Sequence, residues 1–125
     1  MASYNIFSLN IGMSSSLAGL SSLVESENID IVFMQEVRLS SEQIEQTLHG
    51  FKAAVNIDPN NLTKPGIALA WRESVPLTDV VSFDLCRLQV ASLGSLKLVN
   101  LYAPSGTNNR YARTTFFSQE LFNIL

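Results

Sequence analysis

Polar side chains follow three apolar runs of the chain at the point where each run stops. Asn10 closes the first run, Glu36 closes the second, and Tyr102 closes a third one far downstream. Oxygen-bearing side chains at neighbouring strand ends can bind a hard metal ion. Mg²⁺ usually keeps several waters, so a protein needs to supply only one or two carboxylates. The pattern therefore predicts metal-dependent cleavage of a phosphodiester.

Glu36 and Asn10 are the candidate metal ligands, and with Tyr102 they are also the candidate catalytic residues. Glu36 follows a nearly continuous apolar run, so the strand would carry its charge to the margin of a sheet. A carboxylate in such a place is costly unless it is paired or bound to a metal. The Asn10 amide could orient a metal or a phosphate through its oxygen and donate from its nitrogen. Taken alone, each residue also has an ordinary explanation, Asn10 in a turn and Glu36 in a solvated loop.

Tyr102 and Asn100 lie at the end of the last predicted strand. Pro104 favours extended backbone at Ala103 and ends the ladder, which leaves the Tyr102 phenol able to donate to a phosphate oxygen. Asn100 is a polar residue inside an apolar strand, and it needs hydrogen-bond partners if it is buried. We expect Asn100 to contact a substrate phosphate or to brace the site from behind. Tyr102 alone could equally be an amphipathic residue at a sheet margin.

Three arginines are candidate phosphate contacts, because a guanidinium makes strong, charge-assisted hydrogen bonds to phosphate oxygens. Arg38 lies two residues after Glu36 on the same predicted loop, and Arg110 and Arg113 lie near the C-terminus. Arg113 is expected mainly to fix the final helix to the body of the domain. His49, the one histidine of the sequence, is expected on the surface and not as a general base.

Composition indicates one folded domain and argues against a disordered or membrane-spanning chain. Of the 125 residues, 46% are hydrophobic and 15% are charged, and polar residues interrupt every apolar run before it reaches the length of a membrane span. The net charge of −3 is not that of a general electrostatic binder of nucleic acid. The N-terminus has no basic segment ahead of an apolar one, and a single cysteine cannot form an internal disulfide. We therefore expect an intracellular protein, nuclear or cytoplasmic, that is not secreted and has no membrane partner.

Strands dominate the predicted structure. Apolar runs rich in β-branched and aromatic residues indicate strands at 4–9, 29–34, 51–57, 66–71, 77–83, 87–91 and 96–102. The rhythm from residue 51 onward is that of a β-meander. Helical spacing favours helices over 17–27, 41–48 and 109–125, the second one starting from a capping box of Ser40 and Gln43. Trp71 and the phenylalanines are expected in the core, and Cys86 is expected as a small strand residue.

The apolar pattern of the last predicted helix continues to Leu125 without a terminating glycine, proline or basic residue. Helices commonly end in such residues. We therefore expect the chain to be part of a longer protein, with residues 1–125 forming one partial domain that lacks its C-terminal half. A terminal helix that simply docks onto a compact domain is the alternative.

Four segments together resemble, in their order and spacing, the endonuclease/exonuclease/phosphatase family, which includes apurinic/apyrimidinic endonucleases, deoxyribonuclease-I-like nucleases and phosphoinositide phosphatases. They are NIFSLNI at 5–11, DIVFMQE at 30–36, GIALA at 66–70 and NLYAP at 100–104. Two further stretches, QEVRLS at 35–40 and RTTFF at 113–117, look most like the endonuclease domains of non-LTR (LINE-type) retrotransposons. The resemblance implies an α+β (α/β) fold, the N-terminal half of a deoxyribonuclease-I-like two-sheet β-sandwich with mixed and antiparallel strands and flanking helices. This chain would supply one sheet and its helices, with one sheet face unpaired.

By this resemblance, Asn10 and Glu36 match the family's metal-site residues, and Tyr102 matches its active-site tyrosine. The implied cofactor is Mg²⁺ or Mn²⁺, and the implied reaction is hydrolysis of a phosphodiester by an activated water. The implied partners are DNA and a downstream reverse-transcriptase domain in the full-length protein. The later motifs of the family, an Asp-x-Asn pair and a Ser-Asp-His, do not follow Tyr102 in this chain. Two alternatives stay open: a non-catalytic remnant of such a domain, and a phosphatase of the same fold acting on a phospholipid or a small phosphoester.

Overall fold

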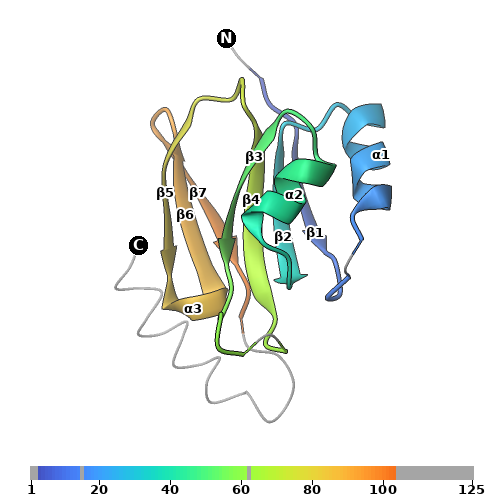
Figure 1. The fold of residues 1–125 in the computed structure, drawn as a ribbon. Coiled ribbons are helices and arrows are strands. Elements are labelled where there is room, and N and C mark those ends of the chain that lie inside the picture. Colours follow the sequence, from blue (N-terminus) through green and yellow to red (C-terminus); the bar gives the residue numbers. More distant parts are fainter. Residues whose placement is uncertain (1–2, 15, 62, 104–125) are drawn as a thin grey trace.

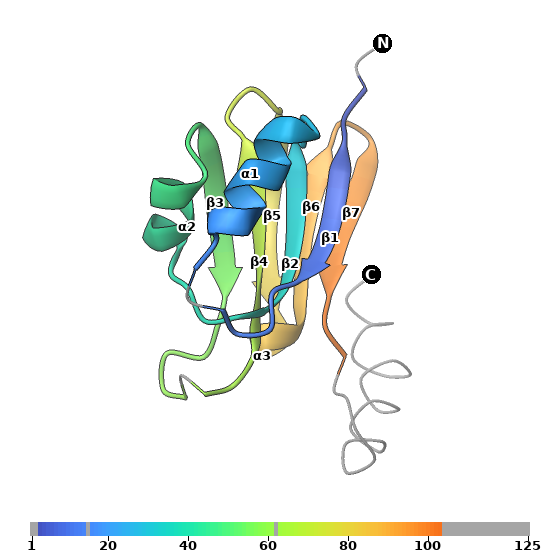
Figure 2. The same ribbon diagram turned by 90° about the vertical axis from the view of Figure 1, so that its right-hand side faces the viewer.

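Two β-sheets are stacked face to face, and two helices cover the outer side of one of them (Figures 1 and 2). The structure is a computed structural model, and it describes residues 3–14, 16–61 and 63–103. None of the helices in these ranges is long and apolar enough to cross a membrane. In chain order the elements are β1 (Ile6–Asn10), α1 (Ala18–Ser26), β2 (Ile31–Val37), α2 (Ser41–Thr47), β3 (Phe51–Asn56), β4 (Gly66–Arg72), β5 (Leu77–Phe83), α3 (Asp84–Arg87), β6 (Leu88–Leu93) and β7 (Leu96–Leu101).

The strands divide into a four-stranded sheet of order β1-β2-β4-β3 and a three-stranded sheet of order β5-β6-β7. β1 and β2 are parallel, and the other neighbouring strands are antiparallel. The expected two-sheet α+β sandwich is thereby confirmed. The expectation that the chain supplies one sheet with an unpaired face is wrong. The chain crosses to the second sheet over residues 73–76, and Val75 is buried between the two sheets.

Alternate residues of the first sheet enter two separate cores, because successive side chains of a strand point to opposite faces. One set packs against α1 and α2, and includes Val32, Met34, Ala68 and Ala70 from the strands and Leu20, Val24 and Ile44 from the helices. The other set fills the space between the sheets and is made of Ile31, Leu69, Val75 and Ala91. The continuous apolar run of β2 is thus explained by burial on both faces.

Most of the predicted elements that fall in the described ranges are confirmed to within two or three residues. α2 begins with the predicted capping box: Ser40 Oγ accepts from the Gln43 N–H (3.2 Å), and Gln43 Oε1 accepts from the Ser40 N–H (2.8 Å). His49 is exposed, as expected. The helix predicted at 109–125, with Arg110 and Arg113, lies outside the described residues.

Two predictions around β5 and β6 are wrong. Cys86 is not a strand residue but lies in the kinked turn α3 with a φ of 72°, and its N–H donates to Asn56 Oδ1 (2.9 Å). Burial raises the pKa of the Cys86 thiol, which is therefore neutral at pH 7. Phe83 is 36% exposed and is not in the core. A bulge between Thr78 and Val81 shifts β5 by one residue and so turns Phe83 to the outer side of its sheet.

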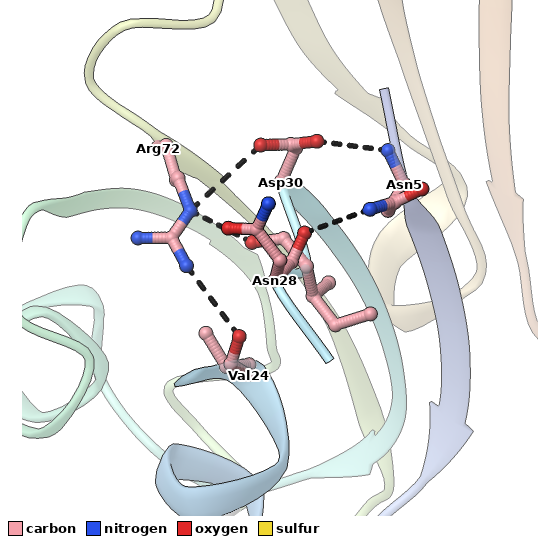
Figure 3. A network of polar contacts seen from close by, with 6 residues as sticks. Asn5, Val24, Asn28, Asp30 and Arg72 are labelled. Atoms are coloured by element: carbon pink, nitrogen blue, oxygen red, sulfur yellow. Dashed lines mark hydrogen bonds and ion pairs between the residues drawn. The ribbon is translucent and has the colours of Figure 1, made fainter. Parts of the chain in front are cut away.

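Arg72 fastens the end of the first sheet where β2 starts and β4 stops (Figure 3). Its Nε donates to the Ile29 carbonyl oxygen (2.8 Å), and its Nη2 donates to the Val24 carbonyl oxygen (3.4 Å) at the end of α1. The guanidinium also pairs with Asp30 (3.8 Å) and lies 4.8 Å from the centre of the Phe51 ring. One side chain therefore ties α1, β2, β3 and β4 together.

We expect Arg72→Met to lower the free energy of unfolding by about 1–3 kcal/mol, because two partly buried carbonyl oxygens lose a charged donor. Urea unfolding followed by circular dichroism measures the change. Lys52→Met is the matched control: Lys52 is exposed on β3, and its replacement should change stability by no more than about 0.5 kcal/mol. Equal stability of the two variants would contradict the role given to Arg72.

A candidate metal centre at the ends of three strands

The carboxyl ends of β1, β2 and β7 lie at the same end of the sandwich, and Figure 2 shows the arrowheads of β1 and β7 directed to that end. β1 and β2 are parallel neighbours, with Asn10 opposite Gln35. β7 belongs to the other sheet, and Gln35 Nε2 reaches it by donating to Asn100 Oδ1 (3.1 Å). The structure thus brings together the strand ends that the sequence marks with polar residues.

Asn10 and Glu36 are in direct contact. Asn10 Nδ2 donates a hydrogen bond to Glu36 Oε2. Asn10 Oδ1 accepts from the Gly12 N–H (2.9 Å), which fixes the direction in which the amide faces. Asn10 is exposed and Glu36 is half-buried. The Asn10 amide therefore orients a carboxylate that solvent can still reach.

A β-bulge in β2 presents Glu36 to Asn10. The pairing of β2 with β4 shifts between Gln35 and Val37, which leaves Glu36 as the extra residue. In a regular strand Glu36 would share the face of Met34 and enter the core beneath the helices; instead Val37 occupies that core. Bulges commonly re-aim a side chain in this way. The φ of Glu36 is 56°, a left-handed backbone that residues with side chains rarely adopt.

The loop after β1 holds the bulge in place. The Ile11 N–H donates to the Gln35 carbonyl oxygen (3.0 Å), and the Met13 N–H donates to the Glu36 carbonyl oxygen (2.7 Å). Gly12 and Met13 have φ values of 61° and 63°, so the loop turns sharply after Asn10. These bonds continue the β1–β2 pairing beyond the strands and keep the two candidate ligands side by side.

Asn100 and Tyr102 contribute in different ways. Asn100 is only 2% exposed, and its Nδ2 donates to the Ala68 carbonyl oxygen (2.9 Å) and to Gln89 Oε1 (3.2 Å). Of the two roles expected for Asn100, these contacts support bracing of the site from behind. Tyr102 follows directly after β7 and is half-buried, and its N–H donates to the Arg87 carbonyl oxygen (2.9 Å).

Arg38 is the candidate phosphate contact that falls within the described residues. It is exposed on the loop that follows Glu36, and it already interacts with another group of the protein. The other two candidates, Arg110 and Arg113, lie outside the described ranges.

The donor set at the strand ends suits a hard cation but does not enclose one. Nowhere in the described part of the chain do three or more His, Cys, Asp or Glu side chains gather in a way that could hold a metal. Glu36 provides one carboxylate. Asn10 turns its amide nitrogen to Glu36, and its amide oxygen accepts from the Gly12 N–H. Oxygen donors of this kind match Mg²⁺, for which one carboxylate and several waters can be enough.

Two supporting side chains are not singled out by the sequence pattern. Gln89 on β6 is 0% exposed, and its Nε2 donates to the Ala54 carbonyl oxygen (2.9 Å). Gln35 Nε2 donates to Ser8 Oγ (3.1 Å) as well as to Asn100. The available signal for Gln89 was a lone amide inside an otherwise apolar predicted strand, since such a group needs partners when it is buried.

A sequence model of the Endonuclease/Exonuclease/phosphatase family matches residues 2–124. No curated protein sequence matches the chain. Among solved structures, the chain is similar to an AP endonuclease from Archaeoglobus fulgidus, with 20% identity and a TM-score of 0.68 over 94% of this chain and 48% of that one. It is also similar to the 3′ phosphatase NExo from Neisseria bound to a product DNA hairpin, with 17% identity and a TM-score of 0.63 over 97% and 53% of the two chains.

A third similar structure is the endonuclease domain of TRAS1, a telomere-specific non-LTR retrotransposon, with 13% identity and a TM-score of 0.61 over 94% of this chain and 55% of that one. At these identities the likeness shows a shared fold. The chain spans about half the length of each of the three structures.

We expect Glu36→Gly to be more stable than Glu36→Ala by about 1 kcal/mol, because left-handed backbone costs roughly this much for any residue with a Cβ and almost nothing for glycine. Both variants lose the contact with Asn10, so the comparison isolates the backbone. Chemical denaturation of the two variants gives the difference. A Glu36→Ala variant that is as stable as Glu36→Gly would mean that the bulge carries no strain.

Proposed function

The chain belongs to the endonuclease/exonuclease/phosphatase family. On that premise we propose that it is the part of a divalent-metal-dependent DNA endonuclease of a retrotransposon that contains the metal-binding residue Glu36. The observation that carries the proposal is the contact between Asn10 and Glu36 at adjacent strand ends. A left-handed bulge residue is costly to the fold, and such costs are typical of functional sites. The bulge supports a role for Glu36 beyond packing.

In this proposal Glu36 and Asn10 hold the metal, Mg²⁺ or Mn²⁺. When bound, a divalent cation supplies charge stabilisation at the phosphoryl oxygens and lowers the pKa of a bound water. Asn10 orients the Glu36 carboxylate through its Nδ2. Tyr102 would donate from its phenol to a phosphate oxygen, and Arg38 would contact the phosphate as a charged donor.

Several observations support DNA as the substrate. One structure of the same fold is bound to a product DNA hairpin, and another is the endonuclease domain of a retrotransposon. The stretches QEVRLS at 35–40 and RTTFF at 113–117 resemble such retrotransposon domains. The net charge of −3 gives no general attraction to DNA, so the affinity would come from contacts at the site and from the bound cation. A downstream reverse-transcriptase domain is part of the same proposal.

We expect the 125-residue chain to bind Mg²⁺ at Glu36, because an accessible carboxylate can be the one charged protein ligand of a magnesium ion that keeps several waters. Titration with MgCl₂ followed by ¹⁵N NMR should shift the backbone amides around Glu36 and the Asn10 side-chain amide. Glu36→Gln should abolish these shifts. Glu25→Gln is the matched control, since Glu25 is exposed on α1, and it should leave them unchanged. Shifts that persist in Glu36→Gln would place the cation elsewhere.

We expect this chain alone not to nick supercoiled plasmid in Mg²⁺, because the Asp-x-Asn and Ser-Asp-His motifs of the family do not follow Tyr102. A longer protein that includes those motifs should nick. Glu36→Gln should then lower its rate about a hundredfold or more, as expected when several kcal/mol of charge stabilisation is lost. Agarose-gel conversion of supercoiled to open-circular plasmid measures the rate.

A small phosphoester, p-nitrophenyl phosphate, is the comparison substrate in the same assay. Turnover of this compound without nicking would favour a phosphatase over a nuclease. Mg²⁺-dependent nicking by the 125-residue chain that disappears in Glu36→Gln would show that the later motifs are not required.

A further inference from the structure

We propose that Gln89 is a positioning residue for the site at the strand ends. Its buried amide fixes Asn100, Asn100 fixes Gln35, and Gln35 directly precedes the bulge residue Glu36. This proposal rests on the proposed function only for its effect on metal binding at Glu36. The coupling between Gln89 and the bulge is a property of the fold itself.

Gln89 is anchored in both sheets. It lies on β6 in the second sheet, and its Nε2 donates to the Ala54 carbonyl oxygen on β3 in the first sheet (2.9 Å). Its Oε1 accepts from Asn100 Nδ2 (3.2 Å). A flipped amide would set the Gln89 oxygen against the Ala54 oxygen and its nitrogen against the Asn100 nitrogen. The Gln89 amide group therefore has one favourable orientation.

The orientation of Asn100 is fixed in the same way. Its Nδ2 faces oxygen atoms: those of Ala68 (2.9 Å), Gln89 (3.2 Å) and Met34 (3.4 Å). Reversal of the amide would place Asn100 Oδ1 among these acceptors inside the sandwich, where an unpaired polar atom is costly. Asn100 Oδ1 is therefore directed to Gln35 Nε2 (3.1 Å).

Gln35 transmits this order to the bulge. Its side chain is held between Asn100 of β7 and Ser8 Oγ of β1 (3.1 Å). Its carbonyl oxygen and that of Glu36 accept from the loop after β1, the second of these bonds coming from the Met13 N–H (2.7 Å). A displaced Gln35 side chain would shift the peptide group between Gln35 and Glu36, where the bulge lies. The Met13 amide is therefore a local reporter of the bulge.

Asn56 provides a matched control inside the same sandwich. It is a buried amide with three hydrogen bonds: its Nδ2 donates to the carbonyl oxygens of Phe83 and Leu88 (3.0 Å each), and its Oδ1 accepts from the Cys86 N–H (2.9 Å). None of these contacts involves the side chains of Gln89, Asn100 or Gln35, although the Leu88 carbonyl belongs to the peptide that precedes Gln89. A purely structural role of Gln89 would make the two amides equivalent.

The experiment compares Gln89→Met and Asn56→Leu in the 125-residue chain by NMR-detected hydrogen exchange. The exchange rate of the Met13 amide is divided by that of the β4 amides, which report opening of the sheet. We expect Gln89→Met to raise this ratio about tenfold and Asn56→Leu to leave it unchanged, although both variants lower overall stability. Ser8→Ala, at an exposed position, removes one acceptor of Gln35 and should raise the ratio to a smaller extent in a chain that folds normally.

A ratio that stays at the wild-type value in a folded Gln89→Met variant would overturn the proposal, as would an equal rise in Asn56→Leu. If Gln89→Met does not fold, a wild-type ratio in Ser8→Ala overturns the proposal, because the Gln35 side chain would then not control the bulge. MgCl₂ titration of the same samples separates this proposal from the proposed function. We expect weaker Mg²⁺ binding in Gln89→Met by about tenfold, the lower end of what indirect partners of a metal site contribute. A wild-type chain whose Glu36 amide does not respond to Mg²⁺ would refute the metal site and leave the exchange test valid.

Discussion

The hydrogen bonds of Asn100 set both the packing of the two sheets and the position of the strand ends. Its nitrogen reaches carbonyl oxygens of β2 and β4, and its oxygen reaches Gln35. A buried amide left without partners costs about 1–3 kcal/mol for each group. If one sheet slid against the other by one residue, Asn100 and Gln89 would both lose their partners. The register between the sheets and the geometry beside Glu36 therefore depend on the same interaction.

The two ends of the first sheet are built differently. At one end Arg72 satisfies carbonyl oxygens of Val24 and Ile29 and pairs with Asp30, which in turn accepts from the Asn5 N–H (2.8 Å) (Figure 3). At the other end β2 contains a bulge with left-handed backbone, and its carboxylate remains within reach of solvent. The first end adds stability, and the second carries strain of the kind that folds retain at functional sites. Arg72 and its partners are well placed to offset that strain.

The sequence was sufficient to place the candidate ligands but not to show how they are presented. Parallel strands put their carboxyl ends at one edge, so the ends at Asn10 and Glu36 could be expected to meet. The bulge could not be predicted, because the predicted strand ends at Met34 and nothing in the residue types after it marks Glu36 as the extra residue that returns Val37 to the face of Met34. The same limit applies to Phe83, which a bulge in β5 turns outward. Alternation shows which residues share a face but not which sheet a strand joins, so β5, β6 and β7 were not assigned to a second sheet.

A carboxylate at this position suits a phosphodiesterase only when a cation accompanies it. Glu36 and a phosphate group about 4 Å apart would repel each other by roughly 1–4 kcal/mol in the dielectric range of a protein surface, and the net charge of −3 adds to that repulsion. A divalent cation between them reverses the sign, because it attracts both groups. The Asn10 amide carries no net charge, so its hydrogen bond orients the Glu36 carboxylate and leaves the negative charge in place. Under the proposed function, Glu36 repels a substrate phosphate when no metal is bound and attracts it through the cation when a metal is bound. The affinity for substrate should therefore follow the occupancy of the metal site and not the net charge of the chain.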